Sequence, residues 1–128
     1  MPATIASTVK FNPTGGTLWV ELKFDTLLLC TYDLLVREAG SNATILREAG
    51  DNTNAEDDRY ALPMPASVNA NRVLWAILTV VDQTGAAGKY KLSMEISQDG
   101  TLLGTIATSS RKIDANSVTE TLVARLVA

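Results

Sequence analysis

Residues 89–97 alternate strictly between apolar and polar side chains, and this pattern constrains the fold more than any other part of the chain. Successive side chains of a β-strand project to opposite faces, so the pattern predicts a strand with one buried and one solvated side. Asp99-Gly100 follows two residues later, and this pair suits a type I′ hairpin turn because both central residues of that turn need positive φ. A β-hairpin is therefore predicted. Its buried side consists of Tyr90, Leu92, Met94 and Ile96.

A two-residue turn also predicts how the two strands of this hairpin pair. Ile96 is expected opposite Leu103, and in that register Leu102 and Ile106 lie on the solvated side. Two aliphatic side chains on a solvated face indicate contact with another molecule.

Alternating segments recur along the chain at the spacing of a sandwich or barrel. Residues 4–11 and 17–24 both alternate, and the turn residues of 12–16 separate them, so these two strands are predicted to pair as a hairpin. Residues 117–127 combine a helical spacing of apolar residues with many β-branched residues, and we assign them to a strand because β-branched side chains favour strands. The fold class is all-β: an antiparallel two-sheet β-sandwich of about eight strands with little or no helix. Jelly-roll and immunoglobulin-like topologies both remain open.

Two predicted strands are apolar on both faces. In residues 27–36 the face opposite the predicted core carries Leu27, Leu29 and Leu35. In residues 72–82 either of two apolar sets can face the core: Leu74, Leu78 and Val80 with Ala76, or Val73, Trp75, Ile77 and Val81. The outer faces of antiparallel sheets are normally polar, so these strands predict more apolar surface than one sandwich can bury.

A turn at Gly40-Ser41 is predicted to join the first of these strands to the next. It would pair Val36 with Ile45, and it would bring Asp33 close to Glu48 as an unfavourable like-charge pair.

Size and charge limit the classes of partner. The 128 residues suit one domain, spanning 1–128, which buries about two-thirds of the surface of the unfolded chain. The net charge is −3 and the basic residues are scattered, so nucleic acid is not a predicted partner. No apolar run approaches the roughly 20 residues of a membrane span, and the start of the chain lacks the features of a signal peptide. A cytoplasmic location without membrane association is expected.

Catalytic and metal-binding side chains are scarce. The chain has no histidine and one cysteine, Cys30, which lies in an apolar run and is expected to be an inert core residue. This composition excludes imidazole-based catalysis and a Cys/His zinc site within one chain. We therefore predict that the protein is not an enzyme and that it needs no cofactor.

The acidic loop 51–58 offers one alternative, a Ca²⁺ site. Ca²⁺ binds carboxylate and amide oxygens, and the loop carries five such candidates: Asn52, Asn54, Glu56, Asp57 and Asp58. The EF-hand pattern is absent, so a plain surface loop is the main interpretation.

Trp19 falls on the polar side of its strand, where it could stack on a sugar ring, fill a pocket of a partner, or lie under a neighbouring loop.

The surplus of apolar faces leads to the functional prediction. The protein is expected to be a non-enzymatic structural or assembly subunit that self-associates, or binds a protein partner, through an apolar sheet face. The interface candidates are Trp19, Leu27, Leu29, Leu35, Leu102 and Ile106. The alternative is a ligand-binding module for carbohydrate or for Ca²⁺ with a ligand.

Overall fold

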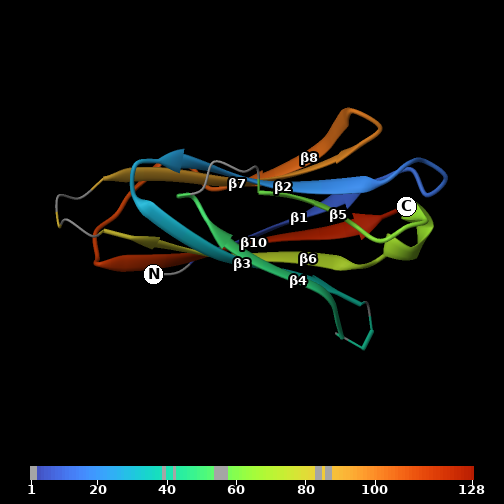
Figure 1. Cartoon of the computed structure of the whole chain (residues 1–128), viewed down its shortest axis with the longest axis horizontal. Helices are drawn as coiled ribbons and strands as arrows, with labels where there is room; N and C mark the ends of the chain where they lie inside the picture. Colours follow the sequence, from blue (N-terminus) through green and yellow to red (C-terminus); the bar gives the residue numbers. More distant parts are fainter. Residues whose placement is uncertain (1–2, 39, 42, 54–57, 83–84, 86–87) are drawn as a thin grey trace.

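The chain forms two β-sheets packed face to face, as the computed structural model shows (Figure 1). The structure describes residues 3–38, 40–41, 43–53, 58–82, 85 and 88–128. Sheet A has the strand order β1-β10-β6-β3-β4, and sheet B has the order β5-β2-β7-β8 with the short β9 also paired to β7. The bounds are β1 Ala3–Lys10, β2 Leu18–Thr26, β3 Leu29–Arg37, β4 Thr44–Asp51, β5 Arg59–Ala61, β6 Val73–Val81, β7 Lys89–Gln98, β8 Thr101–Ala107, β9 Arg111–Lys112 and β10 Ser117–Val127. The one helical element among these residues is the 3₁₀ turn η1, Ala66–Asn69. The predicted all-β sandwich is confirmed.

The core lies between the two sheets and follows the alternation of each strand. On β7 the predicted buried side is confirmed, because Tyr90, Leu92, Met94 and Ile96 are all buried. On β6 the buried set is Leu74, Ala76, Leu78 and Val80. The other apolar set of β6 therefore faces outward.

The predicted pairing of the first two strands is wrong. β1 pairs in parallel with β10 in sheet A, whereas β2 lies between β5 and β7 in sheet B. Residues 12–16 are a turn, as expected, but this turn carries the chain from one sheet to the other. Gln98 holds it there, because its Nε2 donates to the carbonyl oxygens of Asn12 (2.8 Å) and Gly16 (3.0 Å). A Cβ on Gly15 would lie 2.7 Å from the same Nε2, so glycine permits this close approach.

The hairpin of β7 and β8 forms with the predicted turn but with a different register. Asp99 and Gly100 have φ of 52° and 76°, and Ser97 pairs with Leu102 as expected. A bulge then shifts the pairing, so that Ile96 lies opposite Gly104 and Met94 opposite Ile106. One extra residue turns the rest of a strand over. Ile106 is therefore 2% exposed and part of the core, and its prediction as an interface residue was wrong.

A second bulge changes the pairing of β3 with β4. It lies between Val36 and Arg37, and it places Val36 opposite Leu46 instead of Ile45. Asp33 consequently lies opposite Ala49, and the predicted contact with Glu48 does not form. Arg47 instead reaches Asp33, with 3.4 Å between Nη2 and Oδ1.

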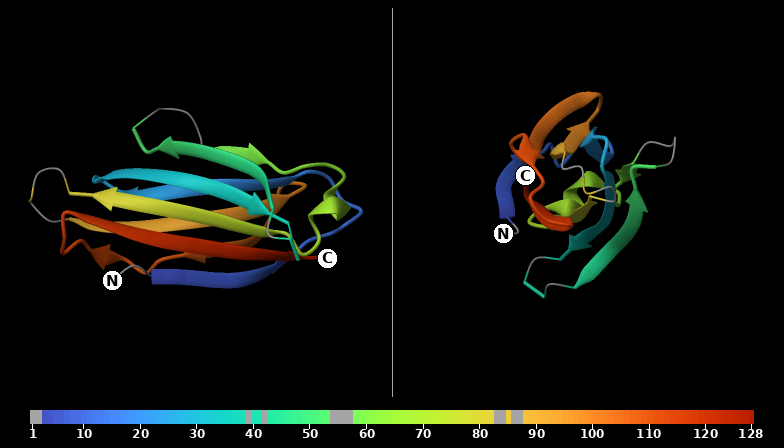
Figure 2. Two further views of the ribbon diagram at one scale, coloured as in Figure 1. Left: turned by 90° about the horizontal axis from the view of Figure 1, so that it is seen from below. Right: turned by 90° about the vertical axis from the view of Figure 1, so that its left-hand side faces the viewer.

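Residues 117–127 form a strand, as predicted, and β10 lies near the centre of sheet A. It pairs antiparallel with β6 and parallel with β1. Figure 2 shows that β1 and β4 are the two outer strands of this sheet, on opposite sides of the sandwich.

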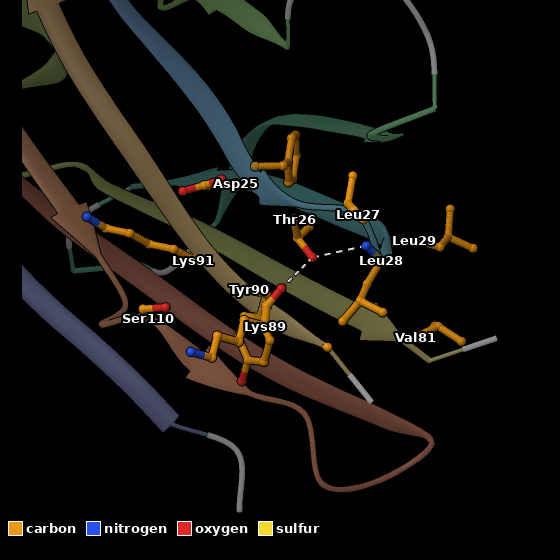
Figure 3. A pocket seen from close by; sticks show the side chains of 12 residues that line it. Asp25, Thr26, Leu27, Leu28, Leu29, Val81, Lys89, Tyr90, Lys91 and Ser110 are labelled. Atoms are coloured by element: carbon orange, nitrogen blue, oxygen red, sulfur yellow. Dashed lines mark hydrogen bonds between the residues drawn. The ribbon is translucent and has the colours of Figure 1, made fainter. Parts of the chain in front are cut away.

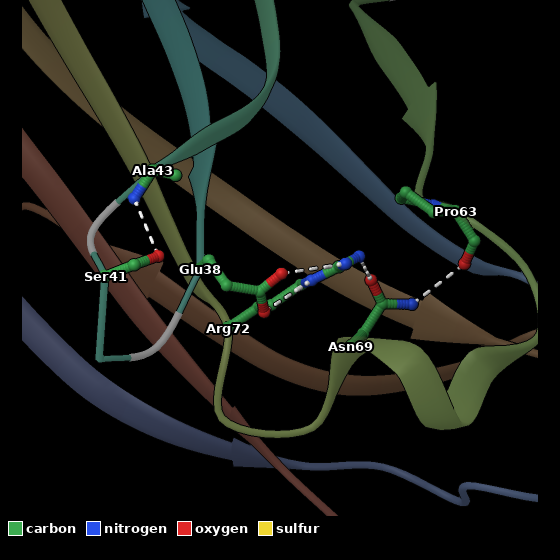
Figure 4. A network of polar contacts seen from close by, with 6 residues as sticks. All are labelled: Glu38, Ser41, Ala43, Pro63, Asn69 and Arg72. Carbon is green, nitrogen blue, oxygen red and sulfur yellow. Dashed lines mark hydrogen bonds and ion pairs between the residues drawn. The ribbon is translucent and has the colours of Figure 1, made fainter.

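A partly buried polar network closes one end of the sandwich (Figure 4). Arg72 donates from Nε and Nη2 to the two carboxylate oxygens of Glu38, both at 3.2 Å, and from Nη1 to Oδ1 of Asn69. Asn69 is fully buried and donates in turn to the carbonyl oxygen of Pro63 at 2.9 Å. Because these groups bind one another, the network fixes η1 and the entry to β6.

Candidate functional site

The outer face of sheet A carries several apolar side chains on its central strands. Trp75 on β6 lies opposite Val123 of β10 on one side and Leu35 of β3 on the other. Ile77 occupies the next outward position of β6, beside Thr121 and Asp33. A continuous row of bulky apolar side chains thus crosses three neighbouring strands.

Arg37 covers the indole of Trp75 in the middle of this face. Its guanidinium carbon lies 4.5 Å from the centre of the ring, a cation–π contact. Nε1 of Trp75 and Nε of Arg37 are buried, and neither has a hydrogen-bond partner within the described part of the chain. A buried donor without an acceptor costs about 1–3 kcal/mol. The chain therefore keeps this tryptophan on its outer face at a cost.

The outer face of sheet B is different, because most of its side chains are polar or charged, although Trp19 and Leu102 also lie on it. Lys23 forms an ion pair with Glu95, with 3.1 Å between Nζ and Oε1. Trp19 lies on this face between Ala61 and Ser97, half-buried, and the guanidinium of Arg59 lies 4.0 Å from the centre of its ring. Arg59 thus occupies one face of the ring that a sugar would need for stacking.

The remaining interface candidates lie in three separate places. Leu29 is half-buried, and Leu35 is only 9% exposed; both face outward from β3 in sheet A. Leu27 precedes β3 and is fully exposed. Leu102 is 55% exposed on the hairpin of sheet B, so the structure does not bring the candidates together in one surface.

The candidate Ca²⁺ residues lie only partly within the described chain. Asn54, Glu56 and Asp57 lie outside it. Asn52 binds the backbone of β3, since its Oδ1 accepts from the amide of Cys30 (2.9 Å) and its Nδ2 donates to the carbonyl of Leu28 (2.8 Å). Asp58 accepts from the hydroxyl of Tyr32 at 2.7 Å. Among the described residues no cluster of three acidic or cysteine side chains suits a metal ion.

The Tyr32 hydroxyl is the centre of a buried polar contact between the sheets. It also hydrogen-bonds to the hydroxyl of Tyr60. Burial, followed by the hydrogen bonds to Tyr60 and Asp58, raises the pKa of Tyr32 above its ordinary value. Gly50 makes room for the ring, because a Cβ there would lie 2.7 Å from the hydroxyl oxygen.

Cys30 is buried on the same inner face. Burial, with a smaller effect of the Asp58 charge, raises the pKa of its thiol to about 12. Because the thiolate is the nucleophilic form, this environment makes Cys30 unreactive at neutral pH.

Sequence reasoning missed a carboxylate in the core. Glu120 of β10 is 1% exposed, and its Oε2 lies 3.2 Å from Nε of Arg111 and 3.4 Å from the hydroxyl of Tyr90. Burial and the charge of Glu120 raise the pKa of Tyr90. Glu120 falls on the apolar side of its strand, which is the one signal in the sequence that could have identified it.

A groove of about 680 Å³ opens beside the turn between β2 and β3 (Figure 3). Leu27, Leu28 and Val81 line one side, whereas Lys89 and Lys91 line the other. The sequence places these residues in three different segments and contains no motif that connects them.

Comparison with protein-family models, curated proteins and solved structures found no match for this chain. Over the described ranges, the chain forms no helix with the length and apolar character that a membrane crossing requires.

Proposed function

We propose that this protein is a non-enzymatic assembly subunit that pairs with a second copy of itself through the outer face of sheet A. The observation that carries this proposal is the row of Val123, Trp75 and Leu35 across the middle of that face. Trp75 and Val123 are half-buried and Leu35 is 9% exposed. Part of this row therefore remains in contact with water, and a partner would bury it.

The dimensions of the face fit a dimer. Five strands about 4.8 Å apart and about eight residues long, at about 3.3 Å per residue, cover roughly 600 Å² of projected area. A standard interface buries about 800 Å² on each partner. Side chains add to the projected area, so this face is large enough.

The charges on the face support a second copy as the partner. Arg47 lies in the cross-strand row of Trp75, whereas Asp51 lies two rows further along, beyond the row of Ile77. A two-fold axis across the strands near Ile77 places Arg47 of one copy over Asp51 of the other, and the reverse. This one pair of charges is complementary about such an axis, as a two-fold dimer requires. Arg37 and Arg125, in the row of Val73, have no acid opposite them in this arrangement.

Sedimentation velocity over a range of protein concentrations tests the proposal. The native protein is expected to form a reversible dimer, and Ile77→Lys is expected to raise the dimer Kd at least about tenfold, because it buries a charge in the contact. Thr105→Lys is the matched control: Thr105 is exposed on sheet B and lies opposite Glu95, as Ile77 lies opposite Asp33.

Circular dichroism shows whether both variants fold. Thr121→Lys provides a second test if Ile77→Lys is unstable. Thr121 lies beside Ile77, and this substitution replaces one polar side chain by another. A native protein that stays monomeric at high concentration overturns the proposal, and so does an equal effect of the control.

A further inference from the structure

One polar group that lines the groove beside the β2–β3 turn, the Thr26 hydroxyl, is already bound within the chain. The hydroxyl of Thr26 donates to the carbonyl oxygen of Lys89 at 2.9 Å and accepts from the amide of Leu28 at 3.0 Å (Figure 3). The Thr26 hydroxyl is therefore not available to a ligand. The charged groups that can recognise one are the side chains at the rim.

One rim of the groove is apolar. Leu27 is fully exposed, Leu28 and Leu29 are half-buried, and Val81 lies opposite Leu29 in the sheet register. Consecutive leucines at an exposed turn offer apolar area that a ligand can remove from water.

The other rim is cationic with one acid. Lys89 and Lys91 are both exposed, and neither forms an ion pair with any residue that the structure describes. Asp25 lies opposite Lys91 in the register, so it offsets part of this charge. The rim has two cations and one anion, in a chain whose net charge is −3.

We infer that this groove binds a small amphipathic anion, an alkyl chain that ends in a carboxylate. The leucines contact the chain, and Lys89, with Lys91, binds the carboxylate. The volume of about 680 Å³ lies in the range of small-molecule pockets, about 300–1,000 Å³. The charged rim lies apart from the proposed dimer face, because the lysines and Asp25 belong to sheet B, whereas Leu29 and Val81 of the apolar rim lie at one end of the outer face of sheet A.

Titration of the full chain with decanoate, followed by the backbone amide signals in NMR, tests the inference. Saturable shifts are expected at residues 26–29 and 88–91. Decanol, which has the same chain without the charge, is expected to bind about fivefold more weakly, since one exposed ion pair is worth up to about 1 kcal/mol.

Variants at the rim give effects of opposite sign. Lys89→Gln is expected to raise the Kd for decanoate about fivefold and Asp25→Asn to lower it about twofold. Lys112→Gln is the matched control. Lys112 is exposed and lies opposite Lys89 in the register of β7 and β9, but it does not line the groove. Leu27→Ser is expected to weaken decanoate and decanol alike.

Equal binding of decanol and decanoate overturns the inference, as does the absence of saturable shifts. Shifts confined to the outer face of sheet A, or binding to phosphatidylglycerol vesicles without binding to free decanoate, also overturn it.

Discussion

The outer faces of the two sheets differ in polarity, although both inner faces are apolar. Sheet B presents charged and polar side chains outward, including the ion pair of Lys23 with Glu95. Sheet A presents Trp75, Ile77 and Val123 from its central strands. Core packing needs only one apolar face per sheet, so the second apolar face of sheet A has another cause, and contact with a partner is the one we propose.

The two tryptophans show the same contrast at single residues. Each lies on an outer face, and each lies under an arginine. Trp19 has Ala61 and Ser97 as neighbours, whereas Trp75 has Leu35 and Val123. The arginine completes a polar surface in sheet B, but in sheet A it covers part of an apolar one.

Replacing each tryptophan tests this contrast with the largest expected effect. Trp75→Ala is expected to lower the free energy of unfolding by about 3 kcal/mol, because it removes contacts on both neighbouring strands. Trp19→Ala is expected to lower it by about 1 kcal/mol, mostly through the contact with Arg59. Urea unfolding at one low protein concentration measures both. A larger loss for Trp19→Ala would show that the two faces are not different in the way described.

Substitution of two glycines, one in an outer strand of each sheet, compares how tightly the inner faces of the two sheets are packed there. A Cβ at Gly50 of β4 would lie 2.7 Å from the Tyr32 hydroxyl, and a Cβ at Gly104 of β8 would lie 3.0 Å from Cγ2 of Val9. Gly50→Ala is expected to cost about 2 kcal/mol, since hydrogen bonds hold the Tyr32 hydroxyl, and Gly104→Ala about 1 kcal/mol. Thermal unfolding ranks the two, and the reverse order would mean that the Tyr32 contact yields easily.

Ionisation of Tyr32, a buried residue of sheet A, is expected to make the free energy of unfolding depend on pH. The folded protein raises the pKa of Tyr32 above its unfolded value of about 10, so the stabilisation is complete below pH 10 and is lost as the pH rises further. The expected slope is about 1.4 kcal/mol per pH unit. Tyr32→Phe is expected to remove this contribution and to leave those of Cys30, which begins above pH 9, and of Tyr90. Unfolding free energies at pH 8 to 11 measure it; identical slopes for variant and native protein would contradict it.

The exposed ion pairs, one on each outer face, have the smallest expected effect. Lys23–Glu95 spans 3.1 Å on sheet B and Arg47–Asp33 spans 3.4 Å on sheet A. Double-mutant cycles are expected to give less than about 1 kcal/mol for each, and less still at high salt. A markedly stronger Arg47–Asp33 pair in conditions that favour the dimer would indicate that the partner covers it.

The strands themselves were predictable, but their partners were not. Residues 117–127 were assigned correctly to a strand because β-branched residues favour extended backbone. The pairing of β1 with β2 was wrong because turn residues are a local signal, and residues 12–16 make an equally good turn between two sheets. Neither bulge was predictable, and one of them buried Ile106.

The candidate site was only partly predictable for a related reason. Leu35 and Leu29 were correctly placed on the side of β3 that faces away from the core, because the other side of this strand carries an unbroken apolar row. The choice between the two apolar faces of β6 stayed open, because the sequence shows two sets of similar character. The groove was not anticipated, because Leu27, Val81 and Lys89 come together only when β2, β6 and β7 end near one another.

Alternating apolar and polar residues specify most of the strands and which side of each strand is buried. That information is local, because neighbouring side chains on a strand point to opposite faces. Tertiary structure alone decided that β1 joins β10, that Ile106 turns inward after a bulge, and that Trp75 faces outward under Arg37. These outcomes depend on which surfaces fit together across the two sheets, and distant segments of a chain carry no local record of that fit.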